Sequence, residues 1–146
     1  MRRIDGSELN VGYRYCSEAV EGIALRAKLR SEGRSDHRAI RKAIDNMAKQ
    51  RRKSQPREAS AGCIFRNFGE ESAGALIDEV GLKGEREGNA VVSDVHANFI
   101  VNEGGASAEE VIELIRRVRK RVKESNGMEL EPEIGVLGKN WDEYLS

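Results

Sequence analysis

The sequence has few of the residues from which disulfide frameworks and structural metal sites are built. Only two cysteines and two histidines occur among its 146 residues. Two cysteines make no disulfide framework, and these four side chains are too few for a structural zinc site. We therefore expect no metal centre and a reducing, cytoplasmic environment.

Long hydrophobic runs are missing as well. No stretch of about 18 apolar residues occurs, so the sequence predicts no membrane-spanning helix. The first ten residues, MRRIDGSELN, are charged and have no apolar core behind them, which argues against a secretory signal. Internal repeats and low-complexity tracts are also absent.

The chain has no excess of charge of either sign. It contains 25 lysines and arginines against 25 aspartates and glutamates. A nucleic-acid coat protein or a membrane-surface binder needs a basic excess, so this balance argues against both classes. Charge is nevertheless uneven, with a basic run over residues 38–57 and an acidic one over 103–113. Such runs are more commonly solvated faces than polyanion sites.

A length of 146 residues is enough for a domain with a core of its own. Residues 1–30 are predicted to be extended, with a half-buried strand where apolar residues alternate over 23–29. Asp36 is placed to cap a helix that ends near Pro56. The apolar face of this helix carries three residues spaced by four and three positions, namely Ile40, Ile44 and Met47.

The remaining elements are a mixture of strands and helices. Short strands are expected at residues 63–65, 91–92 and 99–101, and a helix over 72–80 closed by Gly81. A capping box formed by Ser107 and Glu110 starts a long helix that stops at Asn126-Gly127. Residues 128–137 suggest a strand interrupted at Pro132. Without a strict repeating unit, the fold class expected is α+β.

Short strings between these elements carry the functional information. From Gln55 to Gly138 they are QPREASAGCIFRNF, AGALIDEVGLKG, VSDVHANFIVN, GGASAEEV and LEPEIGVLG. In this order and spacing they resemble the C-terminal half of the UDP-N-acetylenolpyruvoylglucosamine reductases. Upstream, VGYRYC over residues 11–16 resembles the FGYRxS segment of the same family.

The resemblance implies a domain organisation and a reaction. Residues 55–146 would form the substrate-binding C-terminal domain, and residues 1–54 a remnant of the FAD-binding domain with its connecting helix. The family reduces UDP-N-acetylglucosamine enolpyruvate to UDP-N-acetylmuramate with FAD and NADPH, in peptidoglycan synthesis for the cell wall. The main FAD-binding region, with its glycine-rich loop, has no counterpart here, so we expect the isolated chain not to retain FAD.

The resemblance also assigns catalytic roles. Arg14 matches the active-site arginine of the YR string, and its permanently charged guanidinium suits a developing enediolate. Cys63 stands where the family has a serine acid; a thiol, with an ordinary pKa of about 8.5, could still deliver the proton. Glu133 matches the catalytic glutamate, although spacing alone does not separate it from Glu131. The alternatives are a solvent-facing arginine, a small buried cysteine and a surface glutamate.

Three further residues match positions that contact substrate, namely Asn67, Arg66 and His96. A lone histidine is as often structural as functional, and Lys83 in the GLKG string is more simply solvent-facing than a diphosphate ligand. The family's prolines are replaced here by Ala59 and Phe68. Both departures touch loops around the site and bear on substrate affinity.

Two other functions stay open at this point. The chain could be a non-catalytic UDP-sugar-binding module, or a partner that lends this domain to a separate flavin-binding chain. It could also be a fragment of a longer enzyme. No nucleic-acid or membrane partner is expected.

Overall fold

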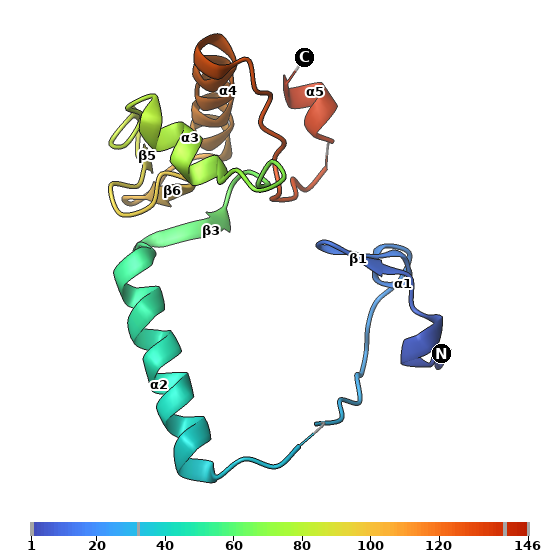
Figure 1. The fold of residues 1–146 in the computed structure, drawn as a ribbon. Helices are drawn as coiled ribbons and strands as arrows, with labels where there is room; N and C mark the ends of the chain where they lie inside the picture. The colour runs from blue at the N-terminus through green and yellow to red at the C-terminus, as the bar shows by residue number, and fades with distance from the viewer. Residues whose placement is uncertain (1, 32, 139, 146) are drawn as a thin grey trace. The chain divides into compact units, whose positions relative to one another are not determined.

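The structure is a computed structural model that describes residues 2–31, 33–138 and 140–145. The chain divides into two compact units between His37 and Arg38 (Figure 1). The predicted domain boundary after residue 54 stays a prediction.

The first unit is built from short elements. A 3-10 helix, η1 (Gly6–Glu8), is capped by Asp5. Strands β1 (Val11–Gly12) and β2 (Tyr15–Cys16) then form a two-stranded antiparallel hairpin. A single helical turn, α1 (Ser17–Val20), follows at once. The expectation of extended structure throughout residues 1–30 is therefore wrong at both helical segments.

The predicted strand over residues 23–29 is also wrong. This stretch has no regular secondary structure. Its large apolar side chains face water: Ile23 is 88%, Leu25 72% and Leu29 92% exposed. Alternation of apolar residues makes a strand only where a partner strand and a core are available, and within the described residues this stretch has neither.

Helix α2 (His37–Ser54) confirms the predicted helix near Asp36. Its predicted apolar face is present but exposed, with Ile40 at 46%, Ile44 at 58% and Met47 at 71%. The periodicity predicted the element correctly, whereas burial of its face depends on a packing partner.

The second unit is organised around a four-stranded antiparallel sheet, ordered β3-β6-β5-β4. Cys63 lies opposite Phe99 at the end of the pairing of β3 and β6. The predicted strand at 63–65 therefore begins and ends earlier than expected, while the other two expected strands are confirmed. The strands are β3 (Ala59–Cys63), β4 (Arg86–Glu87), β5 (Ala90–Val92) and β6 (Phe99–Asn102).

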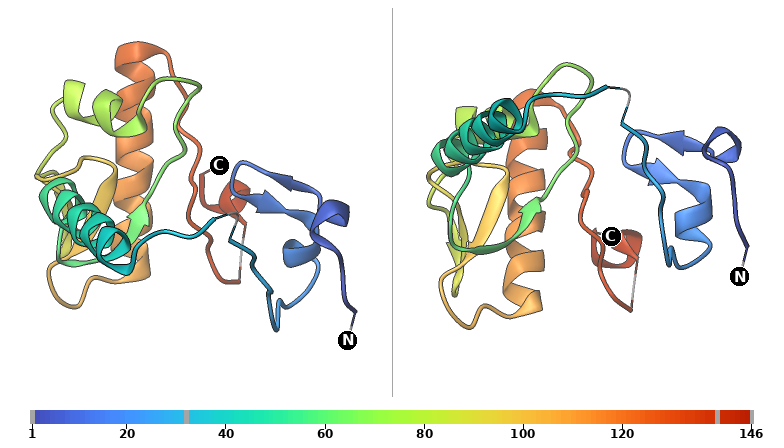
Figure 2. Two further views of the ribbon diagram at one scale, coloured as in Figure 1. Left: turned by 60° about the horizontal axis from the view of Figure 1, so that its bottom comes forward. Right: turned by 90° about the horizontal axis from the view of Figure 1, so that it is seen from below.

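Helices α3 (Ala73–Glu79) and α4 (Ala108–Asn126) pack against each other, and α4 also packs on β4 and β5 (Figure 2). The predicted capping box of α4 is present, and the helix ends at Gly127 with φ +70°. Fully buried side chains from sheet and helices make one core, including Phe65, Ile77, Leu114, Ile115 and Leu130. The predicted α+β class is confirmed.

The C-terminal segment differs from the expected strand over residues 128–137. Only an isolated bridge between Pro132 and Phe65 forms there. Proline has no amide hydrogen to donate, and this limits how far a ladder can run. A short helix, α5 (Trp141–Leu145), follows. No helix in the described part of the chain has the length and apolar character needed to cross a membrane.

Candidate functional site

Four predicted site residues of the second unit, namely Cys63, Arg66, Asn67 and Glu133, lie in, next to or bonded to one extended segment, residues 64–66. This segment is bonded to the C-terminal segment by two backbone hydrogen bonds. Glu133 N–H donates to the carbonyl of Ile64 at 2.7 Å, and Arg66 N–H donates to the carbonyl of Glu131 at 2.9 Å. Residues distant in sequence are thereby brought to one place.

Cys63 and Glu133 are held next to this pairing. Cys63 is half-buried and ends β3, one residue before Ile64. Glu133 is also half-buried, and its own N–H makes the bond to Ile64. The predicted acid and the predicted glutamate therefore belong to one local structure.

Arg66 and Asn67 lie at the other end of the segment. The guanidinium of Arg66 is 3.8 Å from the carboxylate of Glu131, in an exposed ion pair. The Asn67 side-chain oxygen accepts the N–H of Ala73 at 3.2 Å, at the start of α3. Part of the hydrogen-bonding capacity of Asn67 therefore holds the helix, and its amide N–H group is the part available to a ligand.

The His96 ring makes two contacts within the protein. Its Nδ1 accepts the N–H of Asn98 at 3.2 Å, which places the proton of a neutral ring on Nε2. The ring stands edge-on to Phe99, with 5.0 Å between centroids. A histidine in this state presents a fixed donor.

Arg14 belongs to the first unit, in the turn of the β1–β2 hairpin. Its φ of +54° lies in the left-handed region, which costs a non-glycine residue about 1 kcal/mol or more. The guanidinium carbon lies 5.9 Å from the centroid of the Tyr13 ring. Two-residue hairpin turns commonly require a positive φ, so this backbone conformation by itself assigns no role to the side chain.

Two cations of α4 hold the segment that leads to Glu133, a role that no pattern in the sequence indicated. Arg119 donates through Nε to the carbonyl of the buried Leu130 at 2.7 Å and pairs with Glu129 at 3.1 Å. A hydrogen bond from Lys123, with its positive charge, lowers the pKa of Glu129 below the ordinary value. These contacts fix residues 129–130 to the helix.

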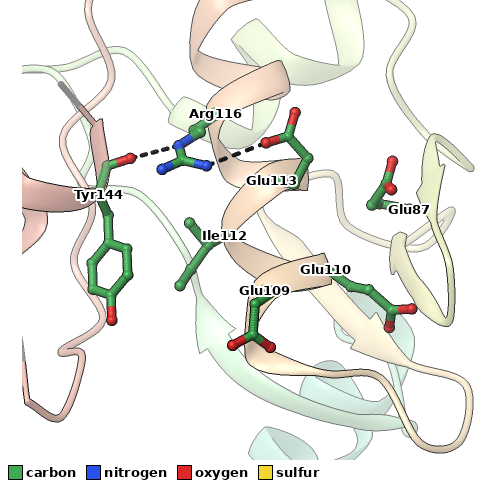
Figure 3. Close-up of a pocket in the computed structure, with 7 residues that line it drawn as sticks. All are labelled: Glu87, Glu109, Glu110, Ile112, Glu113, Arg116 and Tyr144. Atoms are coloured by element: carbon green, nitrogen blue, oxygen red, sulfur yellow. Dashed lines mark hydrogen bonds and ion pairs between the residues drawn. The ribbon is translucent and has the colours of Figure 1, made fainter.

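A hollow of about 380 Å³ lies elsewhere, beside the first turns of α4 (Figure 3). Arg116 crosses it, pairing with Glu113 and donating to the carbonyl of Tyr144. The concentration of carboxylates makes it unsuited to an anionic diphosphate. None of the predicted site residues lines it; its wall is Glu87, Glu109, Glu110, Ile112, Glu113, Arg116 and Tyr144.

The glycine-rich turn before α4 does not fit the pyrophosphate of FAD. Helix N-termini bind phosphate through unsatisfied backbone N–H groups. Here Asn102 Oδ1 accepts two N–H groups of the turn, at 2.8 and 3.0 Å, and Glu110 accepts that of Ser107 at 2.9 Å. Glu109 adds a further negative charge to the first turn. This turn is therefore given no part in holding a flavin.

The second unit is an α+β domain in which residues 64–66 are bonded to Glu131 and Glu133, close to the other predicted polar residues. A sequence model described as UDP-N-acetylenolpyruvoylglucosamine reductase, C-terminal domain, matches residues 55–137. The chain therefore belongs to the UDP-N-acetylenolpyruvoylglucosamine reductase family and contains its C-terminal domain.

Individual relatives agree with this assignment. A reductase of Thermus thermophilus is 43% identical over 127 residues, which cover 87% of this chain and 46% of the relative. That of Heliobacterium modesticaldum is 43% identical over 141 residues, covering 94% and 45%. The crystal structure of UDP-N-acetylenolpyruvylglucosamine reductase from Thermus caldophilus superimposes with a TM-score of 0.76 at 42% identity, covering 89% of this chain and 46% of that one. The chain thus spans about half the length of these relatives.

Proposed function

We propose that this chain carries the substrate-binding part of an oxidoreductase that reduces UDP-N-acetylglucosamine enolpyruvate to UDP-N-acetylmuramate in peptidoglycan synthesis. The observation that supports the proposal is the backbone hydrogen bond between Glu133 and Ile64, the residue after Cys63, in a domain of the reductase family. The setting proposed is the cytoplasm. FAD and NADPH are the cofactors implied, with the flavin held outside residues 102–110.

The part proposed for this chain is the handling of charge and of one proton. Reduction of an enolpyruvyl ether leaves negative charge on the carbon next to the carboxylate. The Cys63 thiol would donate its proton to that carbon, and Glu133 would assist this transfer. Arg14 would pair with the substrate carboxylate through its fixed charge. Arg66, Asn67 and His96 would bind the rest of the substrate.

Calorimetric titration of the isolated chain with UDP-N-acetylglucosamine enolpyruvate tests the proposal, with UDP as the reference ligand. We expect tighter binding of the enolpyruvyl ligand than of UDP. In Glu133→Gln this difference should grow, because a negative charge beside the substrate carboxylate is removed. Glu129→Gln is the matched control on the same segment, since its carboxylate is occupied by Arg119 and Lys123.

Equal affinities for both ligands would contradict the assignment of an enolpyruvyl site to this chain. They would favour a UDP-sugar-binding module without catalytic groups. The colour of the purified chain provides a second check, because we expect it to carry no stoichiometric flavin.

A further inference from the structure

The side chain of Asn98 is bonded to both polar groups of one backbone residue. Asn98 is 3% exposed. Its Oδ1 accepts the N–H of Phe65 at 2.9 Å, and its Nδ2 donates to the carbonyl of Phe65 at 2.9 Å. The backbone carbonyl of Asn98 also accepts the N–H of Ile64 at 2.8 Å. The oxygen and the nitrogen of a buried amide thus each bond to the segment between Cys63 and Arg66.

A side chain is needed at this point because the sheet ends there. The ladder between β3 and β6 stops where Cys63 faces Phe99. Before Phe99 the chain turns, since Phe99 N–H donates to the carbonyl of His96 at 3.0 Å. The backbone of β6 therefore does not continue alongside Phe65. A carboxamide has the donor and the acceptor of a peptide group, so Asn98 extends the pairing by one residue.

The opposite side of the same segment carries the predicted glutamate. Ile64 accepts the N–H of Glu133 at 2.7 Å, and Arg66 donates to Glu131 at 2.9 Å. Residues 64–66 are consequently bonded on both sides. A shift of Phe65 must change the position of Cys63 relative to Glu133, because both are held by the residues that flank it.

We propose that Asn98 is a positioning residue: through Phe65 it sets the geometry between Cys63 and Glu133. This rests on the proposed function for the roles of those two groups. The contacts involve only residues of this chain, so the geometric part has a test of its own.

Asn98→Asp removes one of the two hydrogen bonds to Phe65 and keeps the other. The carboxylate still accepts the N–H of Phe65, but it has no proton for the Phe65 carbonyl and repels it. A protonated carboxyl recovers the donor, so the defect should disappear on acidification. Asn102→Asp is the matched control, because Asn102 Oδ1 only accepts its bonds from Gly104 and Ala106 and a carboxylate can do the same.

The first experiment measures alkylation of Cys63 by N-ethylmaleimide in the ligand-free chain, with peptide mapping by mass spectrometry. Cys16, in the other unit, is the internal reference. At pH 8 we expect Cys63 to react about tenfold faster in Asn98→Asp than in the unchanged chain, because the segment opens more often. The ratio should fall toward one near pH 5, and stay at one throughout in Asn102→Asp.

A ratio of one at every pH would overturn the proposal, as would a rise that acid does not reverse. If Asn98→Asp unfolds at pH 8, hydrogen exchange of side-chain amides, measured by NMR in the unchanged chain, tests the proposal instead. The Nδ2 group of Asn98 should then exchange its protons with solvent at least about tenfold more slowly than that of Asn102, because it is buried and donates to Phe65. Equal exchange rates would contradict the proposed hydrogen bond from Asn98 to Phe65.

The second experiment compares ligand affinities in the same variants. Asn98→Asp should lose about tenfold of the affinity gained from the enolpyruvyl group at pH 8, and a smaller part of the affinity for UDP. An equal loss for both ligands would mean a general structural role and would overturn the positioning role. If the unchanged chain shows no enolpyruvyl-dependent binding, the proposed function fails, and thiol reactivity alone decides the geometric inference.

Discussion

The imidazole of His96 occupies the space that a side chain at position 74 would need. A Cβ added to Gly74 would lie 2.8 Å from His96 Cε1 and 3.3 Å from its Nδ1. Gly74 lies in α3 and His96 in the loop before β6, so this contact sets how closely the helix approaches that loop. It also holds the ring whose Nδ1 bonds to Asn98.

Gly74→Ala should therefore destabilise the second unit. Overpacking of this kind costs about 1–3 kcal/mol, and the better helix propensity of alanine offsets about 1 kcal/mol of it. Urea unfolding followed by circular dichroism would measure the net loss. In a His96→Ala background the same substitution should cost much less, because the clashing ring is gone. Gly135→Ala, with open space around its Cβ, is the control; an equal loss there would refute the steric explanation.

Cys63 should be replaceable by serine but not by alanine in its proposed role. We expect Cys63→Ser to retain NADPH oxidation in an enzyme reconstituted with a flavin-binding part, because a hydroxyl can also donate a proton. Cys63→Ala should lose about 10²–10⁴-fold, the usual contribution of a general acid. Equal rates for all three proteins would show that the thiol is only a packing residue.

Arg119 should be important to the stability of the segment leading to Glu133. Arg119→Met removes a charged donor from the carbonyl of the buried Leu130, and this should cost about 1.5–3 kcal/mol in the free energy of unfolding. Arg121→Met, at an exposed position of the same helix, should change it by less than about 0.5 kcal/mol. Thermal and urea unfolding of both variants would show whether they differ.

The capping box of α4 should contribute measurably to the same unit. Ser107 accepts the N–H of Glu110 at 3.2 Å, and Glu110 accepts that of Ser107 at 2.9 Å. Ser107→Ala should lower the free energy of unfolding by about 1 kcal/mol. Ser125→Ala, near the other end of the helix, should leave it unchanged or slightly higher. Indistinguishable midpoints for the two variants would contradict the prediction.

Glu129 gives a pH dependence with a defined sign. Its pKa is lowered in the folded chain, first by the hydrogen bond from Lys123. Stability from this group is therefore present above the unfolded pKa, about 4.3, and is lost as the pH falls through the folded value. Lys123→Met should raise the Glu129 pKa in a carboxyl NMR titration. Lys120→Met should not, and a similar rise in both would point to general charge effects.

Local signals in the sequence predicted those elements whose causes are local. The capping box of Ser107 and the left-handed Gly127 bound α4 as expected, because both act within one helical turn. The alternation over residues 23–29 failed since a strand needs partners that local sequence does not supply. The strand over 128–137 failed beyond the bridge at Pro132 for the same reason.

For the candidate site, the sequence indicated which residues belong to it but not how they come together. Its residues came from a family resemblance, and their proximity is decided by bonds between distant segments, such as Glu133 to Ile64. Asn98 escaped notice because an asparagine that takes the place of a strand is visible only once the end of β6 is known. The relation of Arg14 to the other site residues stays a prediction.

Helix α2 gives a chain without net charge a strongly uneven distribution of charge. The helix contains seven lysines and arginines against one aspartate, so it has six net positive charges, which the rest of the neutral chain balances with six negative ones. Opposite charges on different copies attract at low ionic strength. Added salt screens that attraction, so this protein should dissolve better in moderate salt than in dilute buffer, and it should adhere to cation-exchange media despite its balanced composition.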